Sequence, residues 1–112
     1  MKYLSYSFDA GPKDFIEVNL NKQANVRVMD SRNYQNYRIG RKHRHYGGLA
    51  KQTPVHIKPP HQGHWYVVID LGGYAGTVIA SVKLLRGILH ASALLGVIMS
   101  LSSFLTSQSD TD

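Results

Sequence analysis

The side chains best suited to chemistry lie together in one segment, between Ser31 and His64. This segment contains no Asp or Glu. It holds seven basic residues and five of the six histidines of the chain, namely Arg32, Arg38, Arg41, Lys42, Arg44, Lys51, Lys58, His43, His45, His56, His61 and His64. Because like charges repel, such a segment is expected either to stay spread in solvent or to contact an anion.

The central part of this segment predicts an anion-binding loop. Guanidinium groups match phosphate oxygens, and tyrosine rings offer stacking surfaces to bases. The expected contacts are four basic residues, two tyrosines and two histidines that gain charge below about pH 6.5, namely Arg38, Arg41, Lys42, Arg44, Tyr37, Tyr46, His43 and His45. Gly47-Gly48 would allow backbone amides to approach an anion. The alternative is a solvated basic surface with tyrosine rings lying over the edge of the fold.

A metal site is the second chemistry that these residues suggest. In an extended chain His43 and His45 would point to the same side, and His61 and His64 have the short spacing of metal ligands. The neighbouring arginines and lysine disfavour a divalent cation, and no acidic residue in the segment offsets them. The chain also has no Cys, which excludes disulfides and thiolate ligands. We therefore expect no metal and no cofactor.

Catalysis has little support from the carboxylates. Asp30 and Asp70 are candidate catalytic acids, but each is equally explained as an ion-pair partner of Arg27, Arg32 or Lys58. Neither a phosphate-binding glycine motif, nor a nucleophile elbow, nor a zinc signature is present. We expect a non-enzymatic protein, and a hydrolase remains the alternative.

The elements that position these residues have the period of β-strands. The chain has 112 residues, a formal charge of +6 and 43% hydrophobic residues, which fits one globular domain over residues 1–85. Five segments have alternating apolar residues, Tyr3–Phe8, Phe15–Asn21, Asn25–Asp30, Thr53–Lys58 and Thr77–Leu84, and a sixth, His64–Leu71, is a nearly continuous apolar run. We predict an all-β fold, an antiparallel β-sandwich of about six or more strands.

Three details of this prediction concern how the strands are connected. His64–Leu71 is the most apolar segment and is expected to be the central strand, buried on both faces. Asn21–Asn25 has the composition of a hairpin turn between its neighbours. Ser31–Gln52 has no clear period and is expected to be a long loop, which is often functional.

The C-terminal part has a different character. Gly87–Leu105 contains no charged residue, and nineteen residues of helix would span about 28 Å. We predict an apolar α-helix over residues 86–106, followed by a polar tail, 107–112. One interpretation is a C-terminal transmembrane anchor in the inner membrane, with the domain in the cytoplasm. The other is a helix packed on the domain or on a second subunit, as in a homo-oligomer.

Four stretches resemble a known family: Asn25–Ser31, Asn33–Tyr37, Gly40–Gly48 and His61–Tyr74. Together they are similar to the small bacterial family called domain of unknown function 1883, and the resemblance covers about residues 1–84. It implies a β-sandwich. Because members occur alone or fused to Toll/interleukin-receptor-type domains, it also implies a recognition or regulatory module in defence or signalling. The family brings no catalytic residues, and the tail after Leu85 departs from its pattern.

These observations favour a binding module. We expect it to recognise a phosphate-bearing anion (a nucleotide, a nucleic acid or an acidic lipid) through the basic loop and to act through a protein partner. The alternative is a structural or interaction protein that is anchored or self-associates through the C-terminal helix, with the basic loop contacting protein or acidic lipid.

Overall fold

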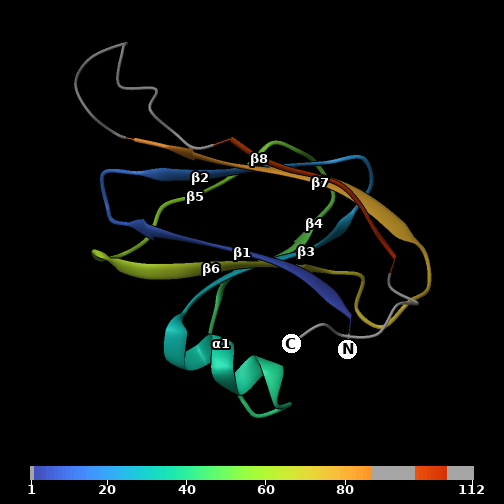
Figure 1. Cartoon of the computed structure of the whole chain (residues 1–112), viewed down its shortest axis with the longest axis horizontal. Helices are drawn as coiled ribbons and strands as arrows, with labels where there is room; N and C mark the ends of the chain where they lie inside the picture. The colour runs from blue at the N-terminus through green and yellow to red at the C-terminus, as the bar shows by residue number, and fades with distance from the viewer. Residues whose placement is uncertain (1, 87–97, 106–112) are drawn as a thin grey trace.

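Two four-stranded antiparallel sheets pack face to face in the computed structural model, which describes residues 2–86 and 98–105 (Figure 1). The first sheet has the strand order β1-β6-β3-β4, and the second has the order β5-β2-β7-β8. The strands are β1 (Tyr3–Ala10), β2 (Phe15–Leu20), β3 (Ala24–Asp30), β4 (Tyr46–Ala50), β5 (Val55–Ile57), β6 (Gly63–Asp70), β7 (Thr77–Leu85) and β8 (Ile98–Leu105). The fold is therefore an all-β sandwich, as predicted.

The core lies between the two sheets, where the alternating apolar residues meet. Side chains from both sheets are fully buried there, among them Ile16, Val18, Val26, Val28, Val67, Ile69, Val78 and Val82. Strand β6 lies between β1 and β3, and its last four residues, Val67–Asp70, are all buried. The expectation of a central strand buried on both faces is confirmed.

The connection between β2 and β3 corrects one expectation. Strand β2 pairs with β5 and β7, whereas β3 pairs with β4 and β6. Asn21–Asn25 therefore carries the chain from one sheet to the other and does not form a hairpin. Alternation shows which face of a strand is buried, but both strands of a sandwich bury one face, so it does not identify the pairing partner.

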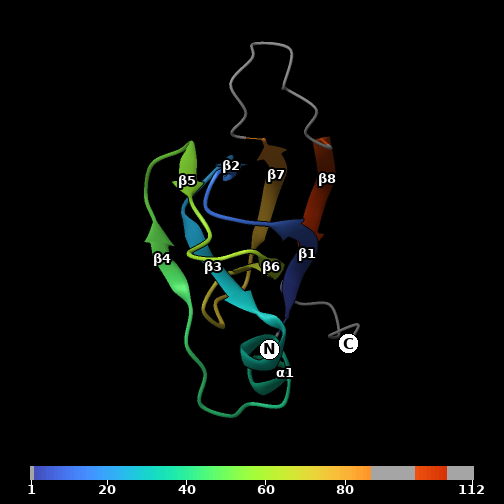
Figure 2. The same ribbon diagram turned by 90° about the vertical axis from the view of Figure 1, so that its left-hand side faces the viewer.

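The segment Ser31–Gln52 is more ordered than expected. It contains helix α1 (Ser31–Arg38) and strand β4, so only residues 39–45 connect them. The helix covers the outer face of the first sheet (Figure 2). There the ring of Tyr34 stacks on Tyr66, with centroids 4.0 Å apart and planes 7° apart. Asp30 caps the helix, because its side chain accepts a hydrogen bond from the backbone N–H of Asn33.

The predicted C-terminal helix is wrong where the structure can test it. Residues Ile98–Leu105 form β8, which pairs antiparallel with β7. The helix prediction rested on the absence of charged residues and on the length of the segment, and neither property distinguishes a helix from a strand. Pairing with β7 satisfies backbone groups of both strands. Residues 87–97 and the predicted polar tail lie outside the described residues. Among the described residues, no helix is long and apolar enough to span a membrane.

Candidate anion-binding site

The predicted contact residues come from three consecutive elements. Tyr37 and Arg38 belong to the last turn of α1, five residues lie on the connection 39–45, and Tyr46 begins β4. The connection starts with a turn at Gly40, whose φ of 76° favours glycine. The backbone N–H groups of Gly40 and Arg41 donate to carbonyl oxygens of the helix, which fixes where the connection starts.

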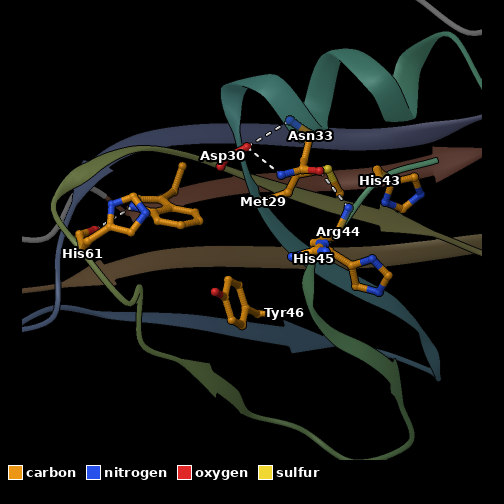
Figure 3. Close-up of a pocket in the computed structure, with 9 residues that line it drawn as sticks. Met29, Asp30, Asn33, His43, Arg44, His45, Tyr46 and His61 are labelled. Atoms are coloured by element: carbon orange, nitrogen blue, oxygen red, sulfur yellow. Dashed lines mark hydrogen bonds between the residues drawn. The ribbon is translucent and has the colours of Figure 1, made fainter. Parts of the chain in front are cut away.

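A pocket of about 590 Å³ lies between this connection and the start of β6 (Figure 3). Its nine lining residues include four of the predicted contacts, His43, Arg44, His45 and Tyr46. The other five were not among the predicted anion contacts, although Asp30 and His61 were considered for catalysis and metal binding: Met29, Asp30, Asn33, His61 and Trp65. Asp30 pairs with Trp65 in the β3–β6 register, so these residues meet only because the two strands are neighbours. No local pattern in the sequence indicates that pairing.

A short chain of hydrogen bonds holds one wall of the pocket. The Oδ1 atom of Asp30 accepts from the backbone N–H and from the Nδ2 atom of Asn33, each at 2.9 Å. The Oδ1 atom of Asn33 in turn accepts from the backbone N–H of Arg44 at 2.7 Å. The helix cap therefore also anchors the basic connection, and it leaves the Arg44 side chain exposed to solvent.

The opposite wall is aromatic. Trp65 is buried, and its Nε1–H donates to the carbonyl oxygen of His61 at 3.1 Å. The rings of His61 and Tyr46 approach Trp65, with centroids at 4.9 and 6.2 Å. Trp65 therefore supports the wall from inside, while half of the Tyr46 surface, 50%, remains open to a ligand.

His43 and His45 point to a common side, as an extended chain predicts. Their ring centroids are 5.3 Å apart, and the rings lie away from His61 and Tyr46 (Figure 3). The Nδ1 atoms of both rings are buried, and neither has a hydrogen-bond partner among the described residues. Burial lowers the pKa of His45, and the nearby charges of Arg27 and His43 lower it further. Its neutral form is therefore favoured at neutral pH.

Asp70, one of the two candidate catalytic acids, has a structural environment. It is fully buried, and its carboxylate accepts hydrogen bonds from Asn25 at 2.8 Å, Arg27 at 3.2 Å, Tyr37 at 2.8 Å and the backbone of Gly72 at 2.9 Å. The ion pair with Arg27 is one of the alternatives considered from the sequence. Asp30, the other candidate, is the cap of α1.

The remaining predicted contacts lie outside the pocket. The Tyr37 ring contacts Tyr3 and His43 edge-on, with centroids at 5.1 and 5.2 Å. Arg38 bonds Gln35 and lies over the Tyr34 ring. Arg41 and Lys42 are exposed beside the helix end.

The glycine pair after Tyr46 serves strand pairing. Gly47 lies in β4 opposite Arg27 and has a φ of 101°. A Cβ atom at this position would overlap the carbonyl oxygen of Val26 on β3. The close approach that requires glycine at position 47 is therefore that of β4 to β3, and the suggested contact of the Gly47-Gly48 amides with an anion stays a prediction.

The histidines outside the pocket are paired with carboxylates. His56 bonds Glu17 at 2.8 Å between β5 and β2, and His64 bonds Asp9 at 2.7 Å between β6 and β1. The hydrogen bond from His56, and next the charge of Lys83, lower the pKa of Glu17. The described residues contain no group of three or more side chains placed to hold a metal ion.

Comparison with known proteins identifies the family but adds no characterised relative. A family model described as a domain of unknown function (DUF1883) matches residues 1–87, which is most of the chain and all of the described part before β8. Searches of curated proteins and of solved structures found no match. The resemblance seen in the sequence is thus confirmed, and the chain belongs to the DUF1883 family.

Proposed function

We propose that this protein is a non-enzymatic binding module for a phosphate-bearing ligand, which it takes into the pocket between the connection 39–45 and β6. The observation that carries the proposal is Arg44. Its exposed guanidinium belongs to a residue that lines the pocket, and it has no acidic partner among the described residues. A planar guanidinium of this kind binds a phosphate group through two parallel hydrogen bonds.

The rest of the pocket supports a ligand with a ring as well as a phosphate. The half-exposed ring of Tyr46 offers a stacking surface, and buried Trp65 holds the wall behind it. The carboxylate of Asp30 would repel a phosphate, so a ligand would place its phosphate near Arg44 and neutral N–H or O–H groups near Asp30. A nucleotide has this distribution of groups.

The size and the surroundings of the pocket favour a small ligand over a long polymer. A volume of about 590 Å³ lies within the usual range of small-molecule sites, about 300–1,000 Å³. Arg41 and Lys42 are exposed on the same connection and would attract anions toward it. We propose that occupancy of the pocket is communicated to a protein partner, since Asp30, the carboxylate among its lining residues, already accepts two hydrogen bonds as the cap of α1.

Calorimetric titration tests this function directly. Purine and pyrimidine nucleoside mono-, di- and triphosphates and a short single-stranded oligonucleotide are titrated into the full chain at low and at physiological salt. Arg44→Gln is expected to weaken binding at least tenfold, because the charged guanidinium and its two parallel N–H donors are lost. The matched control is Arg38→Gln, which removes the same charge from the helix surface outside the pocket and is expected to change affinity less than twofold.

The same titrations decide between this function and the alternative one. If no nucleotide and no oligonucleotide binds even at low salt, the proposal is wrong. Sedimentation with vesicles containing phosphatidylserine then tests the alternative, an interaction protein whose basic connection contacts acidic lipid. Binding of the oligonucleotide but of no nucleotide, with a steep dependence on salt, would instead indicate nonspecific phosphate contacts.

A further inference from the structure

The two imidazoles of His43 and His45 form a distinct feature of the pocket lining. They lie close together on one side of the connection (Figure 3), and His43 contacts the Tyr37 ring edge-on. Arg27 on β3 and Asp70 on β6 are near enough for their charges to act on His45. The pair therefore lies over the outer face of the first sheet, next to the end of α1.

The Nδ1 atoms of this pair lack hydrogen bonds that buried polar atoms normally have. Most buried side-chain nitrogen and oxygen atoms have a partner, because a buried polar atom without one destabilises the folded state. Among the described residues only three such atoms are found, and two of them are Nδ1 of His43 and Nδ1 of His45. Two neighbouring unpaired atoms indicate a site for a group that hydrogen-bonds both rings.

The charges around the pair indicate the sign of that group. Arg27 uses its Nε atom to bond Asp70, and its two Nη atoms have no hydrogen-bond partner among the described residues. Asp70 already accepts four hydrogen bonds and is fully buried, so it has little capacity left for a cation. A guanidinium and two imidazoles can all donate N–H groups. The surroundings therefore favour an oxyanion and disfavour a metal ion.

We propose that His43, His45 and Arg27 form a subsite for one oxyanion group, such as a phosphoryl, sulfate or carboxylate group. The inference rests on the proposed function in one respect, because the natural source of that group would be a phosphate of the pocket ligand. The subsite itself takes a free anion of the same chemistry. Binding is coupled to protonation, since an anion between the rings stabilises their charged forms.

Histidine NMR on the full chain tests the subsite with sulfate as the probe. Ring resonances of all histidines are followed from pH 5 to 8.5 in sodium sulfate and in sodium chloride at equal ionic strength. We expect sulfate to raise the pKa of His45 by about half a pH unit or more and to shift the ring resonances of His43. His56 is the control within the same molecule, because it bonds Glu17 on the second sheet and should respond to the two salts alike.

Variants make the test independent of any one resonance. Sulfate should raise the melting temperature of the natural chain more than chloride does, in part because it is excluded from protein surfaces in general. His43→Gln/His45→Gln should reduce that difference below the one that His56→Gln shows. His56→Gln is the matched control and should retain it. The subsite is overturned if His45 and His56 respond equally to sulfate, or if sulfate stabilises the double variant as much as it stabilises His56→Gln. It is also overturned if equimolar Zn²⁺ shifts both rings while sulfate does not.

The two proposals fail separately in these experiments. A sulfate response without nucleotide binding would contradict the proposed function and support a subsite for a free anion. If nucleotide binding depends on Arg44 but neither His43 nor His45 responds to nucleotide or sulfate, the proposed function is supported and the subsite is contradicted. A response to nucleotide that exceeds the response to sulfate would identify the ligand phosphate as the source.

Discussion

Two polar groups on the outer face of the first sheet, Asp70 and the pair His43/His45, are satisfied to very different degrees. The Asp70 carboxylate is fully buried and accepts four hydrogen bonds, one of them from Arg27. The two Nδ1 atoms are also buried, but they have no partner among the described residues. A buried polar group with complete hydrogen bonding is part of the architecture. Buried atoms without partners, beside a pocket, are better explained by a ligand.

The largest effect is expected from removing the satisfied group. Asp70→Ala would leave Arg27, Asn25 and Tyr37 without their common acceptor and would leave one cation unpaired. We expect a loss of about 3–5 kcal/mol in the free energy of unfolding. Urea denaturation measures it, with Asp9→Ala as the control because Asp9 is 79% exposed. A loss no larger than that of the control would show that the network is not structural.

A smaller effect is expected from removing a single donor to Asp70. Tyr37→Phe deletes only the hydroxyl whose hydrogen bond to the carboxylate is 2.8 Å long, and it keeps the ring between Tyr3 and His43. The expected loss is about 1.5 kcal/mol by urea denaturation. Tyr74→Phe, at an exposed position, is the control. Equal losses in the two variants would contradict a role for this bond.

Acid should weaken the fold through His45 before it acts through Glu17. The pKa of His45 is held below its usual 6.5 in the folded protein, so as the pH falls the imidazole is protonated first in the unfolded chain. The stability present above about pH 6.5 is therefore lost as the pH falls toward the folded-state pKa. The pKa of Glu17 is also lowered, and the stability that this provides is lost only as the pH falls below the usual carboxyl value of 4.5. Melting temperatures at pH 7.5 and 5.5 in chloride measure the first step, which should shrink in His45→Gln. An unchanged difference in that variant would assign the pH dependence elsewhere.

The smallest effect should come from the unsatisfied pair itself. His45→Phe replaces a ring that has an unpaired buried nitrogen with an apolar ring of similar shape, a change that can be neutral or stabilising. We expect the free energy of unfolding to change by less than about 1 kcal/mol in chloride, while the stabilisation by sulfate falls below that of His56→Gln. A loss as large as that of Asp70→Ala would mean that His45 belongs to the architecture.

The strands with strict alternation could be predicted because each carries its own pattern. Ile16 and Val18, or Val26 and Val28, identify a buried face whatever the strand pairs with. Strand β4 could not be found this way, since Tyr46-Gly-Gly-Leu-Ala has no alternating apolar face and is a strand because it pairs with β3. Helix α1 did leave a local signal, an Asp cap three residues before Asn33, that composition and periodicity alone passed over.

For the candidate site, the sequence determined the residue types and the tertiary structure decided which of them meet. The chain itself determines that positive charge is concentrated, and acidic residues absent, between Ser31 and His64. It also determines that His43 and His45 lie on the same side of the connection. Asp30 and Trp65 line a pocket with Arg44 because β3 pairs with β6. Arg38 and Tyr37 contact the helix and the sheet instead, because α1 packs on the first sheet. Contacts between distant segments come from sheet pairing and burial, which no local sequence pattern records.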